Sequence, residues 1–327
     1  MKILLTLFSI LIIPGFLFSQ KVQKAKGQRA KNQESGWKNS ANWEDHKHEV
    51  FVNIGPSFFL GDVGGLNRVG TTKSPVDLDG KSTRFQIGAG YRYKFHPRFS
   101  TTSNLTYAML YGSDSFTEEE IRRSRNITVR TQLLELTQRI EFIVWAKEDV
   151  KTTYNTGQRN MADIFYVYTG ITGFLYAPQA QINDKWTNLR PLKTEGQGLP
   201  GGAKPYGLFN FGIPVGIGFK YGLPGNWRVG IEVSYTKTFT DYLDDTSTEY
   251  YDPNVLLNEL GEDAVYAANP AKENHTWFSA GQQRGNKKDK DAYMFLNITL
   301  TKNITGLGGN KQKRSKGKYQ GKSRTKF

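Results

Sequence analysis

Few residues in this chain could carry catalytic or metal chemistry. The sequence has no cysteine, which excludes disulfides, thiolate metal sites and cysteine nucleophiles. Two of the four histidines, His46 and His48, stand beside acidic residues and could ligate a metal. A short segment of this composition is far more often exposed to solvent. We therefore predict no metal site and no cofactor.

Another histidine, His275, lies near Glu273 and Ser279 in a long polar segment. Hydrolases use such residues as base and nucleophile when the fold brings them together. This one grouping is weak support for catalysis. We expect no enzymatic activity, and we keep a hydrolase site on this segment as an alternative.

An acidic run, Asp241-Tyr242-Leu243-Asp244-Asp245, opens the longest connection in the chain, residues 242–290. Carboxylate oxygens can hold calcium, but the run lacks the spacing of a known calcium loop. We interpret the connection as a solvent-exposed loop. Whether it binds an ion or a ligand remains open from the sequence.

Basic residues gather at the two ends of the chain. Residues 21–47 hold seven Lys and Arg against three acids, and residues 305–327 hold eight and no acid, so with Lys2 they account for +13 of the net charge of +14. The segment 305–327 has the composition of a disordered tail. The partner-binding residues that we predict in it are Lys311, Lys313, Arg314, Lys316, Lys318, Lys322, Arg324 and Lys326.

The N-terminus predicts export. Lys2 precedes an almost wholly apolar run, Ile3 to Phe18, and a polar stretch follows at residue 19. This is the pattern of a signal peptide, which we place at residues 1–20. An exported protein is separated from the nucleic acid of the cell, so we exclude nucleic acid as a partner of the basic tails. In an envelope the candidates are acidic protein surfaces, cell-wall carboxylates and lipid headgroups.

Between a basic N-terminal tail (21–47) and a basic C-terminal tail (305–327), residues 48–304 divide into eight strand-like segments. They are 48–62, 83–95, 99–114, 126–145, 165–179, 209–223, 227–241 and 291–304. Residues 83–95 alternate strictly between an apolar and a polar face, and so do 209–223 and 227–241. In 126–145 the apolar residues change parity, which predicts a β-bulge near Leu133 and Leu134 that turns Glu135, Arg139 and Glu141 inward.

The polar faces of these segments carry glycines next to Arg, Lys and Glu. A soluble sandwich would alternate too, but small residues beside paired charges suit the crowded inside of a narrow barrel. We therefore predict an all-β fold, a transmembrane antiparallel up-and-down barrel of about eight strands spanning 48–304. Such a barrel is filled by side chains and is not a conduit.

The connections predict an orientation. Residues 96–98 and 223–226 are tight turns, whereas 63–82, 115–125, 180–208 and 242–290 are long. Outer-membrane barrels have short periplasmic turns and long outer loops, so both termini should be periplasmic. The 19-residue connection 146–164 departs from this rule. Six aromatic residues should form the periplasmic rim: Phe95, Phe99, Trp145, Phe165, Tyr221 and Trp227.

Seven short motifs follow one another along residues 48–304. They are Leu60-Gly61-Asp62-Val63-Gly64-Gly65, Tyr91-Arg92-Tyr93-Lys94-Phe95, Gly112-Ser113-Asp114, Arg125-Asn126, Thr240-Asp241-Tyr242-Leu243-Asp244-Asp245, Tyr250-Tyr251-Asp252 and Arg284-Gly285-Asn286. Together they resemble the PorG-like family of Bacteroidetes outer-membrane barrels. The resemblance implies a non-catalytic component of the type IX secretion system. Such a barrel would anchor a periplasmic ring formed by a lipoprotein and its partner. The lysine-rich tails depart from the family pattern.

Three functions remain open on this evidence. The first is a scaffold in the outer membrane, in contact with its lipid, that binds the periplasmic ring proteins. The second is the loop-borne hydrolase. The third is a barrel whose long loops bind a ligand at the cell surface.

Overall fold

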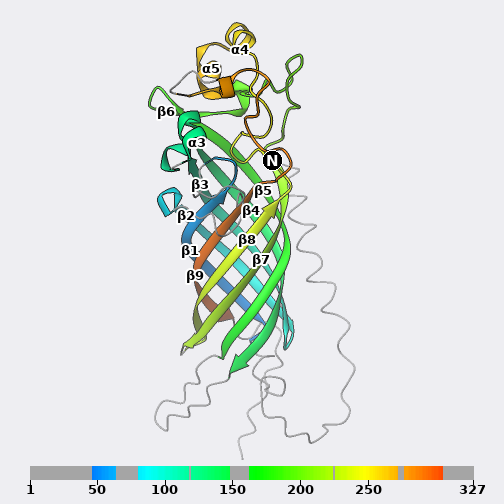
Figure 1. The fold of residues 1–327 in the computed structure, drawn as a ribbon. Helices are drawn as coiled ribbons and strands as arrows, with labels where there is room; N and C mark the ends of the chain where they lie inside the picture. The colour runs from blue at the N-terminus through cyan, green and yellow to red at the C-terminus, as the bar shows by residue number, and fades with distance from the viewer. Residues whose placement is uncertain are drawn as a thin grey trace, which may run out of the picture.

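The computed structural model describes residues 46–63, 80–117, 119–147, 162–223, 225–271 and 276–304. Within these ranges eight long strands form the wall of a barrel (Figure 1). They are β1 (His48–Leu60), β2 (Arg84–His96), β3 (Phe99–Ser113), β4 (Thr128–Lys147), β5 (Asp163–Ile182), β7 (Phe209–Leu223), β8 (Trp227–Thr238) and β9 (Ala292–Ile304). All eight predicted strands are confirmed.

The wall closes on itself. Its strands follow the order β4-β3-β2-β1-β9-β8-β7-β5, and a ladder between β4 and β5 joins the two ends. Each pairing is antiparallel, including the closing one. A closed sheet has no free edge and one enclosed interior. The predicted barrel is therefore confirmed, and the sandwich alternative is wrong.

The predicted β-bulge near Leu133 and Leu134 is wrong. The ladder between β3 and β4 has no register shift, and the irregularity against β5 falls between Ile143 and Trp145. Leu133 and Glu135 both face the interior, because alternate residues of β4 are buried without interruption from Val129 to Ile143. The parity of the apolar residues changes because the interior itself changes along the strand, from apolar to ionic. The inward orientation predicted for Glu135, Arg139 and Glu141 is confirmed.

The weak alternation of β5 and β9 has the same cause. Tyr166, Tyr168 and Phe174 of β5 face the interior, as do Tyr293 and Phe295 of β9. Aliphatic side chains occupy the outer face of the same strands. Both faces are therefore apolar by composition, although only one of them is buried.

The long connections build a structured cap over one end of the barrel (Figure 1). We define the cap as the described residues of 61–83, 114–127, 183–208 and 239–291. It contains β6 (Lys185–Asn188), α3 (Glu120–Arg125), α4 (Pro253–Leu260), α5 (Glu262–Ala268) and the 3-10 turns η2 (Gly80–Ser82), η3 (Asp114–Phe116), η4 (Arg190–Leu192) and η5 (Thr276–Phe278). These elements were not predicted, because each is too short to show a hydrophobic period. In the described part of the chain, no helix is long and apolar enough to cross a bilayer.

Tight turns join the strands at the opposite end, as predicted. Pro97 and Arg98 link β2 to β3, and Gly225 and Asn226, with φ of 70° and 66°, lead into β8. β1 begins and β9 ends at this same end, because His48 lies opposite Ile304. Residues 148–161 of the connection between β4 and β5 lie outside the described residues, as do the predicted signal peptide and nearly all of both tails.

Candidate functional site

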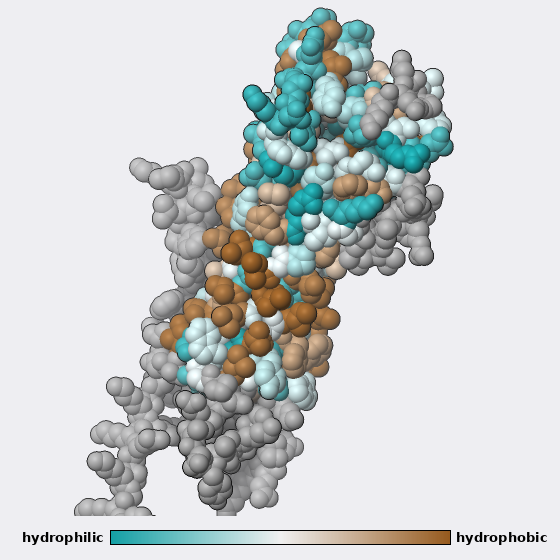
Figure 2. Space-filling view, turned by 90° about the vertical axis from the view of Figure 1, so that its left-hand side faces the viewer, coloured by the Kyte–Doolittle hydropathy of each residue, from teal (hydrophilic) through white to brown (hydrophobic). Residues whose placement is uncertain are grey.

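An apolar belt covers the outer face of the barrel wall, below a hydrophilic cap (Figure 2). Exposed side chains on the wall include Val52, Ile54, Ile87, Ile140, Ile171, Ile217, Ile231 and Ile298, each at least 51% exposed. An apolar surface of this extent on a closed barrel is suited to a bilayer and not to water. The structure is that of an outer-membrane barrel.

Aromatic residues border the belt at the end with the tight turns. Phe95, Phe99, Trp145, Tyr221 and Trp227 stand at the ends of their strands there and are between 37% and 50% exposed. Interfacial belts of membrane proteins place aromatic rings at this level. Five of the six aromatic residues predicted for a rim therefore lie together at this end of the barrel.

Inside the wall, near the tight turns, lies a network of ion pairs centred on Glu49. Its carboxylate is 2.8 Å from Arg92, 2.5 Å from Lys94 and 2.6 Å from Arg228. All four side chains are at most 2% exposed. They meet because β1, β2 and β8 each direct alternate residues into the lumen.

Two further carboxylates extend this network across the lumen. Glu141 of β4 is 2.7 Å from Arg92, and Glu232 of β8 is 2.8 Å from Arg139. Arg139 also lies 3.1 Å from Glu141 and so joins the two halves. The result is one continuous set of paired charges, which is how buried ions are tolerated.

Tyrosines of β5 fill the remaining space in this layer. Tyr166 donates a 2.7 Å hydrogen bond to Glu232, and Tyr168 donates one of 3.1 Å. Lys220 lies 4.4 Å from the Tyr166 ring. A side chain at Gly218 would overlap that ring, which explains why glycines line the inner face of β7.

This lumen network contains five cationic side chains and three carboxylates among the described residues. They are Arg92, Lys94, Arg139, Lys220 and Arg228, with Glu49, Glu141 and Glu232. Because all eight are buried, they fill the lumen at this height. The arrangement closes the barrel and leaves a formal excess of positive charge toward the end with the tight turns.

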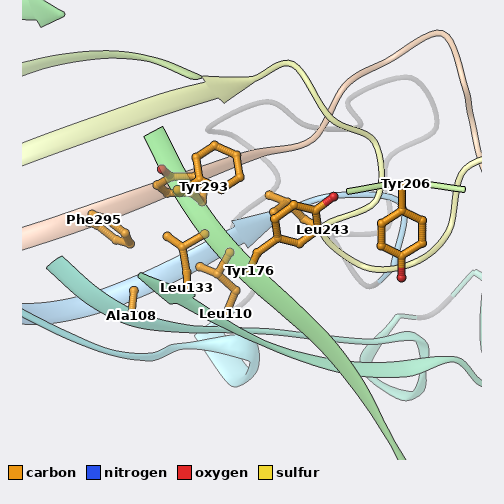
Figure 3. Close-up of a cluster of buried hydrophobic side chains, with 9 residues drawn as sticks. Ala108, Leu110, Leu133, Tyr176, Tyr206, Leu243, Tyr293 and Phe295 are labelled. Atoms are coloured by element: carbon orange, nitrogen blue, oxygen red, sulfur yellow. The ribbon is translucent and has the colours of Figure 1, made fainter. Parts of the chain in front are cut away.

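Nearer the cap, an aromatic and aliphatic layer closes the lumen again (Figure 3). We call it the aromatic layer, and it comprises Ala108, Leu110, Leu133, Phe174, Tyr176, Tyr206, Leu243, Tyr293 and Phe295. Phe174 meets Tyr293 edge-on at 6.2 Å between ring centroids. Leu243 belongs to the acidic run 241–245, which is therefore anchored on the barrel core. Our prediction that this part of the long connection is exposed to solvent is wrong.

The aspartates of this run bind donors of the cap itself. Asp244 accepts the backbone N–H groups of Asp62 at 2.9 Å and Val63 at 3.2 Å. Asp241 accepts the hydroxyl of Ser247 at 2.7 Å. In the ranges that the structure describes, no group of three or more histidines and acids could hold a metal ion. The run serves to fold the loop.

Arg125, at the end of α3, ties three connections together. It binds Asp114 through two hydrogen bonds of 2.8 and 2.9 Å. It also donates to the carbonyl oxygen of Asp62 at 2.7 Å and to that of Arg284 at 2.9 Å. Residues that follow β1 and β3 and precede β9 thus share one buried guanidinium.

Arg284 is the second such centre. It lies 3.1 Å from Glu195 and donates to the carbonyl oxygens of Asp245 at 2.5 Å and Ala268 at 3.1 Å. Glu195 in turn accepts the backbone N–H of Ser247 at 2.8 Å. Side chains and backbone groups from 183–208 and 239–291 are joined by these bonds into one unit.

Burial shifts the protonation equilibria of the cap. It raises the pKa of Asp245 to about 6, against the lowering effect of Arg284 and of the hydroxyls of Thr194 and Tyr206. Burial alone would lower the pKa of Arg284, but the carboxylates of Glu195 and Asp245 raise it above its usual range. Asp245 is therefore a cap carboxylate that titrates near physiological pH.

The structure brings most of the motifs singled out in the sequence together. Five of them meet in the cap, at residues 60–63, 112–114, 125–126, 240–245 and 284–286. Glu195 was missed, because it stands in a glycine-rich stretch with no motif of its own.

The other predicted residues are scattered or lie outside the described ranges. His48 contacts the rings of Tyr91 and Tyr93 on the outer face, whereas the neighbouring Glu49 points into the lumen. Strand alternation thus separates the histidine from that acid. His275 lies outside the described residues, as do Lys311, Lys313, Arg314, Lys316, Lys318, Lys322, Arg324 and Lys326.

Three solved outer-membrane proteins are similar in structure to this chain. They are Neisserial surface protein A, the Ail protein of Yersinia pestis and OprG of Pseudomonas aeruginosa, at 8%, 8% and 10% identity. The matches cover 79%, 79% and 80% of this chain and 97%, 98% and 99% of those chains, with TM-scores of 0.35, 0.33 and 0.36. Similarity at this level says nothing about function. None of the curated proteins matches the sequence.

A family model matches residues 38–258, which is more than half of the chain. The match covers β1 to β8 and the cap residues as far as α4. The chain thus belongs to the family described as a domain of unknown function, DUF6089.

Proposed function

We propose that this protein is a non-enzymatic anchor in the outer membrane whose periplasmic face binds partner proteins. The observation that carries the proposal is the double closure of the lumen, by the lumen network and by the aromatic layer. A barrel closed at two levels offers no path for a substrate. Its function then lies at its two ends and on its surface.

The proposed orientation places the cap outside the cell and the tight turns in the periplasm. It rests on the contrast between the tight turns at 97–98 and 225–226 and the long, structured connections at the other end. Both basic tails would then enter the periplasm beside the aromatic rim. Their cationic residues and the 146–164 connection form the proposed binding face.

The resemblance to PorG-like barrels supports a particular partner, the periplasmic ring of the type IX secretion system. Most of the motifs that carry the resemblance lie around Arg125 and Arg284 in the cap, whereas Arg92 and Lys94 belong to the lumen network. A lipoprotein ring with acidic surfaces would suit the basic tails. On this proposal the barrel positions the ring and transports nothing itself.

Capture from detergent-solubilised envelopes tests the partner. The full chain with an affinity tag should retain the ring lipoprotein, and a variant with the eight basic residues of 305–327 replaced by glutamine should retain much less. A variant with Lys287→Gln and Lys288→Gln in the cap serves as the control and should behave as wild type. Recovery of no ring component with the wild-type chain would contradict the proposal.

Surface labelling tests the orientation separately. Because the chain has no cysteine, Lys288→Cys in the cap and Arg98→Cys in a tight turn each introduce a single thiol. A membrane-impermeant maleimide should label the Lys288→Cys variant on intact cells, and the Arg98→Cys variant only after lysis. The opposite labelling pattern would reverse the orientation.

A surface-binding role is the second candidate, because the cap is a built structure with exposed aromatic residues. Tyr266 and Trp277 are each 50% exposed on it. A cavity of about 320 Å³ between Gly201, Tyr251 and Gly281 adds a recess. Glycan-array binding by cells that display the protein, lost with Tyr266→Ala and Trp277→Ala, would favour this role.

A further inference from the structure

A band of stacked cationic and aromatic side chains lies where the outer face of the wall meets the cap. Its members come from six elements: Lys81 (η2), Arg84 (β2), Tyr111 (β3), Phe116 (η3), Arg130 (β4) and Trp186 (β6). We call this set the arginine–aromatic band. Neither the closure of the lumen nor the proposed periplasmic face accounts for it.

The stacking within the band is close. The guanidinium carbon of Arg84 is 3.7 Å from the centre of the Tyr111 ring, and that of Arg130 is 4.2 Å from the Trp186 ring. The rings of Tyr111 and Trp186 meet edge-on at 6.4 Å. Such stacking holds the planar guanidinium groups in fixed orientations at little further entropic cost.

The strand register sets the height of the band above the apolar belt. Tyr111 lies opposite Arg130, which lies opposite Gln179, in one row across β3, β4 and β5. Leu134 of the belt, which is 42% exposed, stands four residues further along β4. At about 3.3 Å per residue on a tilted strand, the row lies roughly 10 Å above Leu134, and Phe85, which is 50% exposed beside Arg84, marks the upper end of the apolar belt. This is the level of lipid headgroups.

The two arginines hold their charge without a carboxylate partner among the described residues. Arg84 donates to the carbonyl oxygens of Lys81 and Thr83, and Arg130 donates to the side-chain oxygen of Gln179. Each guanidinium has five donors, so several remain for a ligand. Oriented arginines with spare donors suit a phosphate group, which they can bind through paired hydrogen bonds.

A polar cleft adjoins the band on the cap side. It has a volume of about 450 Å³, and its lining includes Tyr111, Ser113, Asn126, Gln181 and Tyr266. Hydroxyl and amide groups beside aromatic rings are the usual lining of a carbohydrate site. A ligand that reaches both features would carry a phosphate on a sugar.

We propose that the arginine–aromatic band binds the phosphorylated sugar headgroup of a glycolipid in the leaflet that surrounds the cap. The phosphate would lie on Arg84 and Arg130, the sugar in the adjoining cleft and the acyl chains against the apolar belt. The choice of leaflet rests on the orientation proposed above, whereas the binding itself does not.

Native mass spectrometry of the full chain tests the proposal in nanodiscs of phosphatidylcholine doped with lipid A, a doubly phosphorylated glycolipid. The wild-type protein should retain lipid A at least tenfold more often than the Arg84→Ala/Arg130→Ala double variant. Lys287→Ala/Lys288→Ala removes the same charge from an exposed part of the cap and should match wild type. Gel mobility before and after heating checks that each variant is folded.

A third variant, Arg84→Lys/Arg130→Lys, keeps the charge but loses the planar donors, and it should retain an intermediate amount. Equal retention by wild type and the Arg84→Ala/Arg130→Ala variant would overturn the proposal, as would equal retention of lipid A and phosphatidylglycerol by the wild type. Nanodiscs contain the same lipids in both leaflets, so a negative result here is independent of the orientation and of the ring partner. Likewise, failure to capture a ring component from envelopes would not contradict lipid binding by the band.

Discussion

The lumen network and the cap both bury charged side chains, but they use them differently. In the lumen network, strand residues pair with one another, as Glu49 does with Arg92, Lys94 and Arg228. In the cap, Arg125 and Arg284 bind mostly backbone carbonyl oxygens and single carboxylates. The backbone of a strand is already satisfied by its ladder, so its side chains are left to pair with each other. The backbone of a loop has no such ladder, so its carbonyl oxygens accept hydrogen bonds from buried side chains instead.

This difference predicts different consequences for stability. A defect in the lumen network leaves an uncompensated charge inside the wall, so it should affect unfolding of the whole barrel. A defect in the cap should open the cap locally, while the wall below it stays folded. The four predictions below test this contrast, in order of decreasing expected effect.

Glu49→Ala should have the largest effect. It leaves Arg92, Lys94 and Arg228, and also Lys220 at 3.8 Å, without their shared carboxylate in a buried site. Such a change costs about 3–5 kcal/mol or more. Urea unfolding in detergent, followed by gel mobility, measures the loss. Glu259→Ala on the exposed face of α4 is the control and should change stability by less than about 0.5 kcal/mol. Equal stability of the two variants would show that the lumen network does not hold the wall together.

Leu133→Ala should come next, because Leu133 is fully buried in the aromatic layer that separates the two regions. Removing a buried leucine side chain costs about 2–5 kcal/mol. Leu134→Ala, one residue further along β4, faces the bilayer and should cost less than about 1 kcal/mol, because lipid replaces the lost contact. A larger loss for Leu134→Ala in the same unfolding experiment would restore the β-bulge that the structure excludes.

Arg284→Ala should open the cap without unfolding the barrel. Loss of its charged hydrogen bonds to Glu195 and to two carbonyl oxygens costs about 2 kcal/mol, or roughly 30-fold in the opening equilibrium. Limited proteolysis within 239–291 reports this opening, and the urea midpoint of the wall should stay unchanged. Arg123→Ala, an exposed residue of α3, is the control. A parallel fall in wall stability would mean that the two regions unfold together.

The cap should also resist protease better at pH 5 than at pH 7.5, and this effect should be the smallest. Burial raises the pKa of Asp245 from 3.8 to about 6. The protonated carboxyl therefore stabilises the folded cap fully below pH 3.8, and this stabilisation is lost as the pH rises through 6. Between pH 5 and 7.5 the expected change in the rate of cleavage is about tenfold. Asp245→Asn should abolish the roughly tenfold change in cleavage rate between pH 5 and pH 7.5, because the amide does not titrate. Slower cleavage at pH 7.5 than at pH 5 in the wild-type chain would contradict the predicted direction of the pH effect.

Much of the barrel could be predicted from the sequence. Period-two alternation in residues 83–95, 209–223 and 227–241 identified the strands and the inward position of Arg92, Lys94, Lys220, Arg228 and Glu232. The prediction was least accurate where the interior changed from ionic to apolar, as at Leu133, because hydropathy alone does not say which face is buried. It could not identify the role of Glu49, since its partners lie on strands far away in the sequence.

By itself the sequence determined the closed wall, the filled lumen, the aromatic rim and the contrast between tight turns and long connections. Those features follow from local alternation and turn residues, which act over a few positions. Only the tertiary structure decided that the long connections form a cap, that Asp241, Asp244 and Asp245 are buried in it, and that Arg84 and Arg130 stack on neighbouring aromatic rings. These contacts join segments up to 224 residues apart, as Asp62 and Asn286 show. No local pattern encodes such pairings, because they depend on which strands become neighbours when the barrel closes.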